Sequence, residues 1–180
     1  EKLVEGIISR SQKHLKNGVT TIEVKSGYGL SVDEELKMLR AIKTANETTI
    51  ATLVPTCLAA HMKPKDWNQD RDYLDVIINE LFPIIKAENL ATRVDAFVEA
   101  SAFSPEEIKP YFQKAKEMGF DITVHADQFT TGGSQVAVDF EAVSADHLEA
   151  STEKEIQLLA KSNTIATALP GASIGLGYAY

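Results

Sequence analysis

Short apolar segments rich in β-branched residues recur along the chain, separated by longer segments whose apolar residues repeat every three to four positions. The short segments are typical of buried strands, and the longer ones of helices with one apolar face. The predicted strands span residues 19–26, 49–59, 93–100, 121–126, 141–147 and 164–170. This alternation predicts an α/β fold in which parallel strands are joined by crossover helices.

Helix starts are marked by a serine or threonine with a glutamate three residues later, which together satisfy free backbone N–H groups. This pattern occurs at Ser31, Ser104 and Thr152. A further helix is predicted over the first residues, ending at Gly18. Another is predicted over 71–89, in which Pro83 should kink the helix or begin a new one.

Two architectures satisfy the alternation, an open doubly wound sheet and a closed eight-stranded barrel. No G-x-G-x-x-G motif follows the first predicted strand, and polar residues gather at C-terminal strand ends, where barrels build their sites. We therefore expect parallel (β/α) units of a TIM-like barrel, with about six of its eight strands present. Residues 1–180 should be the central part of a single barrel whose first and last strands are absent, because both ends look cut from a longer chain.

Composition narrows the choice of partner. The net charge is -8 without a cluster of lysine and arginine, so a nucleic-acid backbone or an anionic membrane would be repelled. A small polar molecule is the expected partner. Cys57 is the single cysteine and cannot form an internal disulfide, and no segment has the pattern of a membrane span or signal peptide. We expect a cytoplasmic protein.

Histidines stand at the C-terminal ends of three predicted strands, as His61, His125 and His147. One such histidine is more often a core or surface residue, but three that converge at a barrel mouth indicate a site. Imidazole is the commonest ligand of catalytic zinc or iron, which favours metal-dependent hydrolysis. His147 could be a second ligand, or a general acid/base beside the metal. Asp146 could orient His147 or cap the following helix.

Other residues have more than one interpretation. Tyr28, between two glycines, could clamp a polar substrate or pack over the barrel mouth. Lys25 could be a Schiff-base lysine of an aldolase or an ordinary charged residue. The segment 130–133 could hold a phosphate, although it contains no lysine. Cys57 is most simply a core residue.

Three blocks resemble the imidazolonepropionase family of the amidohydrolase superfamily: TTIEVKSGYGLSVDEELKMLRAI, HADQFTTGGSQVAVDFEAVSADHLE and ALPGASIGLGYAY. The similarity runs from about residue 18 to the last residue. It implies a metal-dependent barrel with one divalent ion, zinc or iron. It also implies hydrolysis of 4-imidazolone-5-propanoate to N-formimidoyl-L-glutamate in histidine degradation.

The resemblance also implies roles for individual residues. His125 matches a metal-binding histidine, and His147 matches a histidine beside the reacting carbonyl. Gln128 falls where many members carry a glutamate that contacts substrate and water, which makes it a catalytic and substrate-binding candidate. Tyr28 and His61 match residues that line the substrate pocket. Whether the protein is a homodimer is left open.

The chain also departs from the family pattern. The His-x-His pair of the first strand would precede residue 1, and the aspartate ligand of the last strand would follow residue 180. The segment around Glu99 is shorter than usual, which leaves the role of that residue open, and CLAAHMKP replaces a pattern closer to Gly-Ala-His. The alternatives are another cyclic amidohydrolase, a peptidase-like relative, or a catalytically incomplete fragment.

Overall fold

The computed structural model describes residues 1–67 and 70–177. Within them, six strands form one parallel sheet in the order β1-β2-β3-β4-β5-β6. The strands are β1 (Thr21–Lys25), β2 (Thr52–Ala60), β3 (Arg93–Val98), β4 (Asp121–Ala126), β5 (Ser144–His147) and β6 (Ile165–Ala168). All six predicted strands are confirmed, with ends that differ by a few residues.

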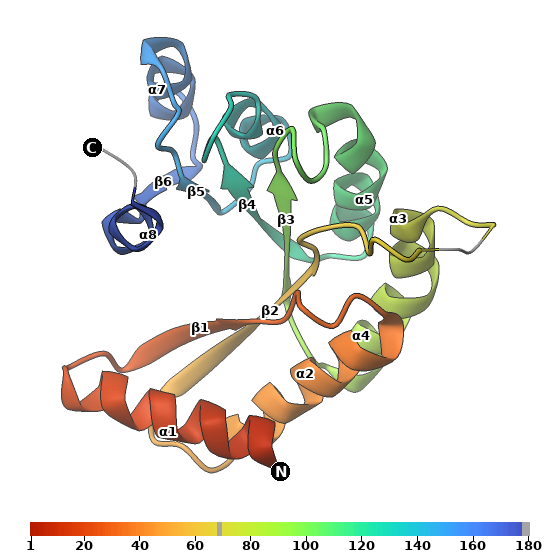
Figure 1. Cartoon of the computed structure of the whole chain (residues 1–180), viewed down its shortest axis with the longest axis vertical. Coiled ribbons are helices and arrows are strands. Elements are labelled where there is room, and N and C mark those ends of the chain that lie inside the picture. Colours follow the sequence, from red (N-terminus) through yellow and green to blue (C-terminus); the bar gives the residue numbers. More distant parts are fainter. Residues whose placement is uncertain (68–69, 178–180) are drawn as a thin grey trace.

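The strand order decides between the two architectures. A doubly wound sheet reverses its strand order at a switch point, whereas here every strand lies beside its predecessor in the chain. Winding in one direction keeps the crossover helices on one side, so the sheet curls. Figure 1 shows the strands as an arc with α2 (Val32–Asn46), α4 (Phe82–Glu88) and α5 (Pro105–Glu117) around its convex side. The expectation of TIM-like (β/α) units is confirmed.

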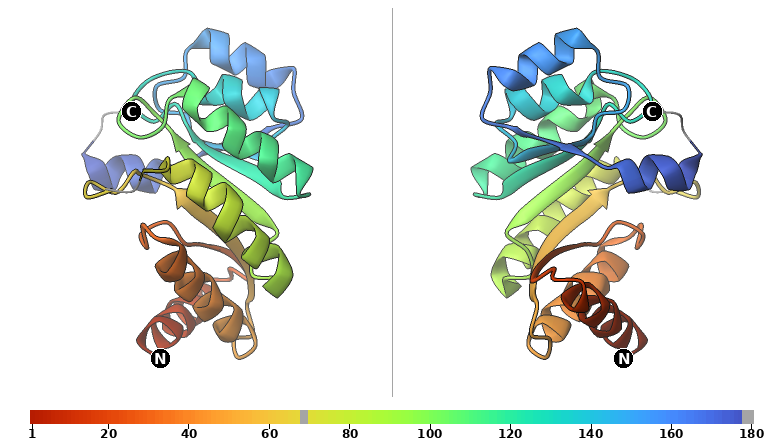
Figure 2. Two further views of the ribbon diagram at one scale, coloured as in Figure 1. Left: turned by 90° about the vertical axis from the view of Figure 1, so that its right-hand side faces the viewer. Right: turned by 90° about the vertical axis from the view of Figure 1, so that its left-hand side faces the viewer.

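The remaining helical segments are α1 (Lys2–Lys16), α3 (Tyr73–Val76), the π-helix η1 (Ile77–Leu81), α6 (Gly133–Asp139), α7 (Glu153–Ala160) and α8 (Pro170–Leu176). Figure 2 shows that the N-terminal units and the C-terminal units lie at opposite ends of the molecule, with β2 and β3 crossing between them. No helix of the described segments is long and apolar enough to cross a membrane.

Local signals predicted the helix boundaries well. The hydroxyl of Ser31 accepts a hydrogen bond from the backbone N–H of Glu34, and Ser104 and Thr152 form capping boxes. Pro83 lies in the first turn of α4, directly after the π-helix η1. A wider turn before a proline accommodates the missing backbone N–H, so η1 joins α3 to α4 in one irregular helix.

The two faces of the sheet differ in chemistry. Every second side chain along the strands, for example Val94, Ala96 and Val98, is buried against the helices. Together these side chains form part of an apolar core. Its largest fully buried side chains include Tyr73, Tyr111, Phe82, Phe112, Leu39 and Ile77. The positions between them face the concave side and carry polar groups, among them Lys25 and Asp95. The concave side therefore holds charge rather than a packed apolar interior.

Candidate active site

The concave side ends in a row of four aromatic rings at the C-terminal ends of the strands. The ring centroid of Tyr28 lies 4.9 Å from that of His61, which lies 6.3 Å from that of His125. The ring of His125 in turn lies 5.2 Å from that of His147. The structure therefore brings together four of the five predicted site residues, from the ends of β1, β2, β4 and β5.

His125 is oriented by a buried carboxylate. Its Nδ1 lies 3.0 Å from both Asp95 Oδ1 and Asp95 Oδ2, and Asp95 is fully buried. Burial raises the pKa of Asp95, but the nearby His125 and Lys25 outweigh it and hold that pKa well below its usual range. An ionised carboxylate only accepts hydrogen bonds, so the contact with Asp95 requires a proton on Nδ1 of His125.

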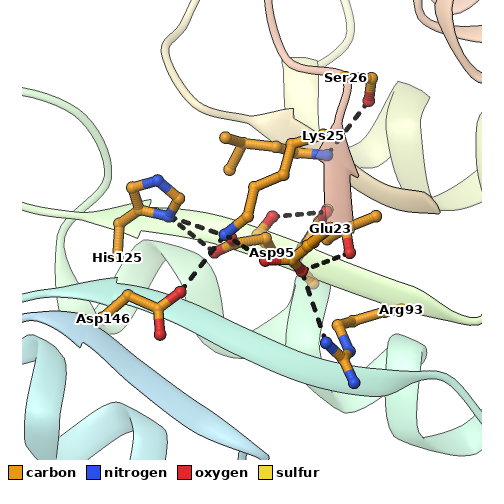
Figure 3. A network of polar contacts seen from close by, with 10 residues as sticks. Glu23, Lys25, Ser26, Arg93, Asp95, His125 and Asp146 are labelled. Carbon is orange, nitrogen blue, oxygen red and sulfur yellow. Dashed lines mark hydrogen bonds and ion pairs between the residues drawn. The ribbon is translucent and has the colours of Figure 1, made fainter. Parts of the chain in front are cut away.

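Lys25 is surrounded by carboxylates. Its Nζ lies 2.6 Å from Asp95 Oδ2, 3.3 Å from Asp146 Oδ2 and 3.4 Å from Glu23 Oε2, as Figure 3 shows. Burial lowers the pKa of Lys25, but these carboxylates outweigh it and raise the pKa above its usual value. A Schiff-base lysine needs the opposite shift, because only the neutral amine attacks a carbonyl. The aldolase interpretation of Lys25 is therefore wrong.

Asp146 takes neither of its two predicted roles. Its carboxylate accepts a hydrogen bond from Lys25, and the helix that follows β5 is capped by Thr152. The reason is the strand register, which pairs Asp146 with His125 and so places its side chain on the concave side.

His147 has an unusual backbone conformation. Its φ is +88°, in a region that residues other than glycine seldom adopt. Its Nδ1 is buried and lies 3.5 Å from Glu149 Oε1, too far for a strong hydrogen bond. Burial and the neighbouring His125 lower the pKa of His147, so the neutral ring is favoured. A neutral imidazole can accept a proton at one ring nitrogen and donate a hydrogen bond from the other.

His61 and Tyr28 form the outer part of the row. His61 stacks on Phe97 at a centroid distance of 5.8 Å, and its Nδ1 is buried. Burial and the nearby His125 lower the pKa of His61. Tyr28 is 74% exposed, so its phenol faces solvent rather than packing into a core. An exposed phenol whose ring lies beside His61 at the barrel mouth is compatible with both the clamp and the packing interpretation of Tyr28.

The loop that carries Tyr28 is held by a glutamate that sequence reasoning missed. Glu35 on α2 is fully buried, and its carboxylate accepts hydrogen bonds from the backbone N–H groups of Gly27 and Gly29. A Cβ atom on Gly29 would lie 2.6 Å from the backbone nitrogen of Glu35. The sequence signal that could have indicated this role is the run VDEE at the start of α2, in which Glu35 lies on the buried side of the helix.

Glu99 has a clear structural role, which the sequence left open. It is 3% exposed and accepts hydrogen bonds from the backbone N–H groups of Phe129 and Thr130, and from the Thr130 hydroxyl. It thereby anchors the loop after β4, in which Gln128 is half-buried. Gln128 thus lies on an anchored loop shortly after His125, with Ala126 and Asp127 between them.

The phosphate-cradle interpretation of residues 130–133 is wrong. The backbone N–H groups of Gly132 and Ser134 donate to Asp127, and that of Thr130 donates to Glu99. Backbone donors that already serve carboxylates are not available to an anion. Cys57 is fully buried in the core, and burial raises the pKa of its thiol to about 12, as expected for a core residue.

A polar loop over residues 61–72 follows the C-terminal end of β2, and a loop at this position is expected to cover the site. The indole N–H of Trp67 donates to the backbone carbonyl of Arg71, and its ring lies 5.0 Å from that of Tyr73. These contacts direct the described part of the loop toward α3. Residues 68–69 lie outside the described residues, as do the last three residues of the third resemblance block, so the covering role stays a prediction.

Comparison with known proteins agrees with this geometry. No family model matches the chain. The imidazolonepropionase of Erwinia tasmaniensis is 45% identical over 173 residues, which are 95% of this chain and 43% of that protein. The imidazolonepropionase of Yersinia pseudotuberculosis is 44% identical over 174 residues, 96% of this chain and 43% of that protein. This chain is a homologue of the imidazolonepropionases. It spans less than half the length of these curated relatives.

Solved structures confirm the barrel architecture. Adenine deaminase from Arthrobacter aurescens superposes with a TM-score of 0.70 at 14% identity, over 97% of this chain and 54% of that one. Ochratoxinase from A. niger gives a TM-score of 0.61 at 15% identity, over 97% and 46%. At these identities the likeness shows the fold alone, parallel (β/α) units of a TIM-like barrel, and neither the chemistry nor the substrate.

The family resemblance implies a divalent metal ion. His125 fits one position in such a site, because Asp95 holds its Nδ1 and leaves the Nε2 lone pair for a ligand bond. Within residues 1–67 and 70–177, no group of three His, Cys, Asp or Glu side chains is arranged to hold a metal ion. The described residues thus fit the metal through one ligand rather than a complete set.

Proposed function

We propose that this protein hydrolyses the cyclic amide of 4-imidazolone-5-propanoate to N-formimidoyl-L-glutamate, with zinc or iron as its divalent ion. The observation that carries the proposal is the row of rings at the barrel mouth, in which a half-buried His125 lies beside a largely buried His147. The 45% identity to a protein named imidazolonepropionase supports the choice of substrate.

In this proposal His125 binds the ion through Nε2. Polarisation of the amide carbonyl and a lower pKa of the attacking water are the chemistry that such an ion supplies. His147 donates a hydrogen bond to the carbonyl oxygen as negative charge develops on it, and its neutral state at physiological pH allows this. Gln128 can donate and accept hydrogen bonds at once, which suits contact with both substrate and water.

The pocket wall is formed by Tyr28 and His61. His61 is supported from one side by Phe97, so a flat heterocyclic substrate can stack in the row of rings. The exposed phenol of Tyr28 can hydrogen-bond a polar group of the substrate. The loop that bears Tyr28 is fixed by Glu35, which limits the conformational entropy lost on binding.

We further propose that residues 1–180 are the central part of a single barrel, with the first and last strands and their metal ligands supplied by further residues. In support, β1 and β6 form the two edges of the sheet, and Ile165 on β6 is 62% exposed. A closed barrel has no such edges. The cytoplasmic location and the question of a homodimer stay predictions.

The test uses the polypeptide expressed from its complete natural reading frame. We expect chelation to abolish turnover of 4-imidazolone-5-propanoate and added zinc or iron to restore it, with the product identified by mass spectrometry. His125→Ala should lose both bound metal and activity. The matched control, His14→Ala, changes an exposed histidine of α1 and should keep both. Full metal occupancy without turnover of this substrate would overturn the proposal.

A second candidate is hydrolysis of a different cyclic amide. Arg93, an arginine on the concave side, lies at the start of β3 and 3.5 Å from Glu23, so it is at the end of the sheet opposite the mouth. It is thus badly placed to bind a propanoate group. A panel of cyclic amides with and without a carboxylate arm distinguishes the two candidates through the ratio of their kcat/KM values.

A further inference from the structure

We propose that Asp95 and Lys25 are a positioning pair for His125, in which Asp95 fixes the Nδ1–H tautomer and Lys25 fixes Asp95. The proposal rests on the proposed role of His125 as a metal ligand. Neither residue is proposed to contact the metal ion or the substrate. Each would act on the chemistry only through the orientation and tautomer of the His125 ring.

The contact between Asp95 and His125 supports the first part of the proposal, that Asp95 fixes the tautomer of His125. Nδ1 of His125 lies 3.0 Å from each carboxylate oxygen, so one N–H group is shared between two acceptors. In Figure 3 the second nitrogen of the His125 ring points away from Asp95. The carboxylate thereby sets both which nitrogen carries the proton and which way the other one faces.

The second part of the proposal is that Lys25 fixes Asp95. The Asp95 carboxylate has no access to solvent, so its negative charge must be stabilised by neighbouring groups. The Lys25 Nζ atom donates to Asp95 Oδ2 at 2.6 Å and to Asp146 Oδ2 at 3.3 Å. These bonds link β1 to β3 and to β5, and the bond to His125 adds β4. Rotation of Asp95 away from His125 would break its short bond to Lys25.

A structural salt bridge would give the same contacts without any role in positioning. Stability measurements alone do not separate the two, because removal of either partner from a buried ion pair destabilises a protein in both cases. The tautomer of His125 does separate them. Only a positioning role makes the proton on Nδ1 depend on Asp95.

The experiment measures ring ¹⁵N shifts of His125 by NMR, in the metal-free protein from the complete reading frame at about pH 8, where histidine is ordinarily neutral. We expect the Nδ1–H tautomer in the parent protein. Asp95→Asn should give a mixture, because its amide can either donate or accept. Asp95→Ala should lose the preference, and Lys25→Met should weaken it. Asp146→Asn removes a carboxylate that accepts a hydrogen bond from Lys25 rather than from His125, so it is the matched control and should leave the tautomer unchanged.

Zinc affinity provides a second readout. Asp95→Asn should weaken zinc binding by about 10- to 100-fold, the usual effect of losing a partner behind a metal-bound histidine. Asp146→Asn should leave it within about threefold. An unchanged His125 tautomer in folded Asp95→Asn protein would overturn the proposal, and this isosteric variant keeps the test available if Asp95→Ala does not fold.

The tautomer is measured without metal or substrate, so the two proposals fail separately. Lack of hydrolysis together with an Asp95-dependent tautomer would overturn the proposed substrate and leave the positioning pair intact. Hydrolysis with a tautomer that is indifferent to Asp95 would overturn only the positioning pair.

Discussion

The ring of His147 lies 5.2 Å from that of His125, although the strand register places the two residues on opposite faces of the sheet. His125 pairs with Asp146, whereas His147 pairs with Ala126, whose side chain belongs to the core. The positive φ of His147 turns the chain at the end of β5 and accompanies this departure from strand alternation. Backbone strain of this kind costs about 1–3 kcal/mol and is common at functional sites.

The proposed role of His147 predicts a specific kinetic effect. His147→Ala should lower kcat by about 10²- to 10³-fold, because a donor to the developing oxyanion is lost, while KM changes by only a few-fold. His147→Asn is the matched control for the backbone, since asparagine tolerates positive φ. Steady-state kinetics on the protein from the complete reading frame provide the measurement. A kcat within a few-fold of the parent in His147→Ala would exclude this role.

The fold was predictable from sequence because its signals are local. Apolar periodicity marked all six strands, and the Ser-x-x-Glu and Thr-x-x-Glu patterns marked the starts of α2, α5 and α7. The placement of His61, His125 and His147 at one end of the sheet also followed, because parallel strands bring their C-terminal ends to one edge. The meeting of the His147 and His125 rings did not follow, because it accompanies the positive φ of His147. These inferences needed only the order of elements along the chain.

The residues behind the site were not predictable in the same way. Lys25 and Asp95 are separated by 70 positions, so no local pattern reports their contact. A lysine at a strand end looked like a candidate nucleophile until the carboxylates of neighbouring strands were placed around it. Glu35 and Glu99 were likewise missed as anchors, because each binds backbone N–H groups of a loop that sequence gives no reason to place nearby.

Gly29 should be intolerant of a side chain. In Gly29→Ala the new Cβ would lie 2.6 Å from the backbone nitrogen of Glu35, so the backbone must shift, at a cost of about 1–3 kcal/mol in the free energy of unfolding. The matched control is Gly175→Ala in α8, where nothing lies within 4 Å of the added Cβ. Alanine there should be neutral or stabilising by up to about 1 kcal/mol. Equal urea midpoints for the two variants would contradict the packing seen at Gly29.

Because of Glu99, the free energy of unfolding should depend on pH in the acid range. Burial raises the pKa of its carboxyl, but hydrogen bonds from Thr130, Ala100 and Phe129 outweigh it, so the folded pKa lies below the ordinary value of 4.5. A depressed folded pKa contributes stability that is present above about pH 4.5 and is lost as the pH falls through the folded pKa. In Glu99→Gln the free energy of unfolding should fall by about 1–3 kcal/mol at pH 7, because an amide replaces an acceptor.

The comparison of two pH values tests this assignment. Between pH 7 and about pH 3.5, the parent should lose more stability than Glu99→Gln, since the variant has no carboxyl to protonate there. Glu106→Gln is the matched control, because Glu106 is exposed on α5 and pairs with Lys109 at the surface. It should change stability by less than about 0.5 kcal/mol. Parallel pH profiles for the parent and Glu99→Gln would show that Glu99 is not the titrating anchor.

Removal of the half-buried Lys25 cation should be among the most damaging single changes in the sheet. Lys25→Met keeps much of the side-chain volume but leaves Asp95 and Asp146 without their shared partner, which should cost about 3–5 kcal/mol in urea unfolding. Lys37→Met, which breaks an exposed pair with Glu34 on α2, should cost less than about 1 kcal/mol. Adding Asp95→Asn to Lys25→Met should recover part of the loss, because it removes the uncompensated charge. If Lys25→Met were no more damaging than Lys37→Met, the carboxylates would have to be stabilised by other groups, and Lys25 could not be what holds Asp95 against His125.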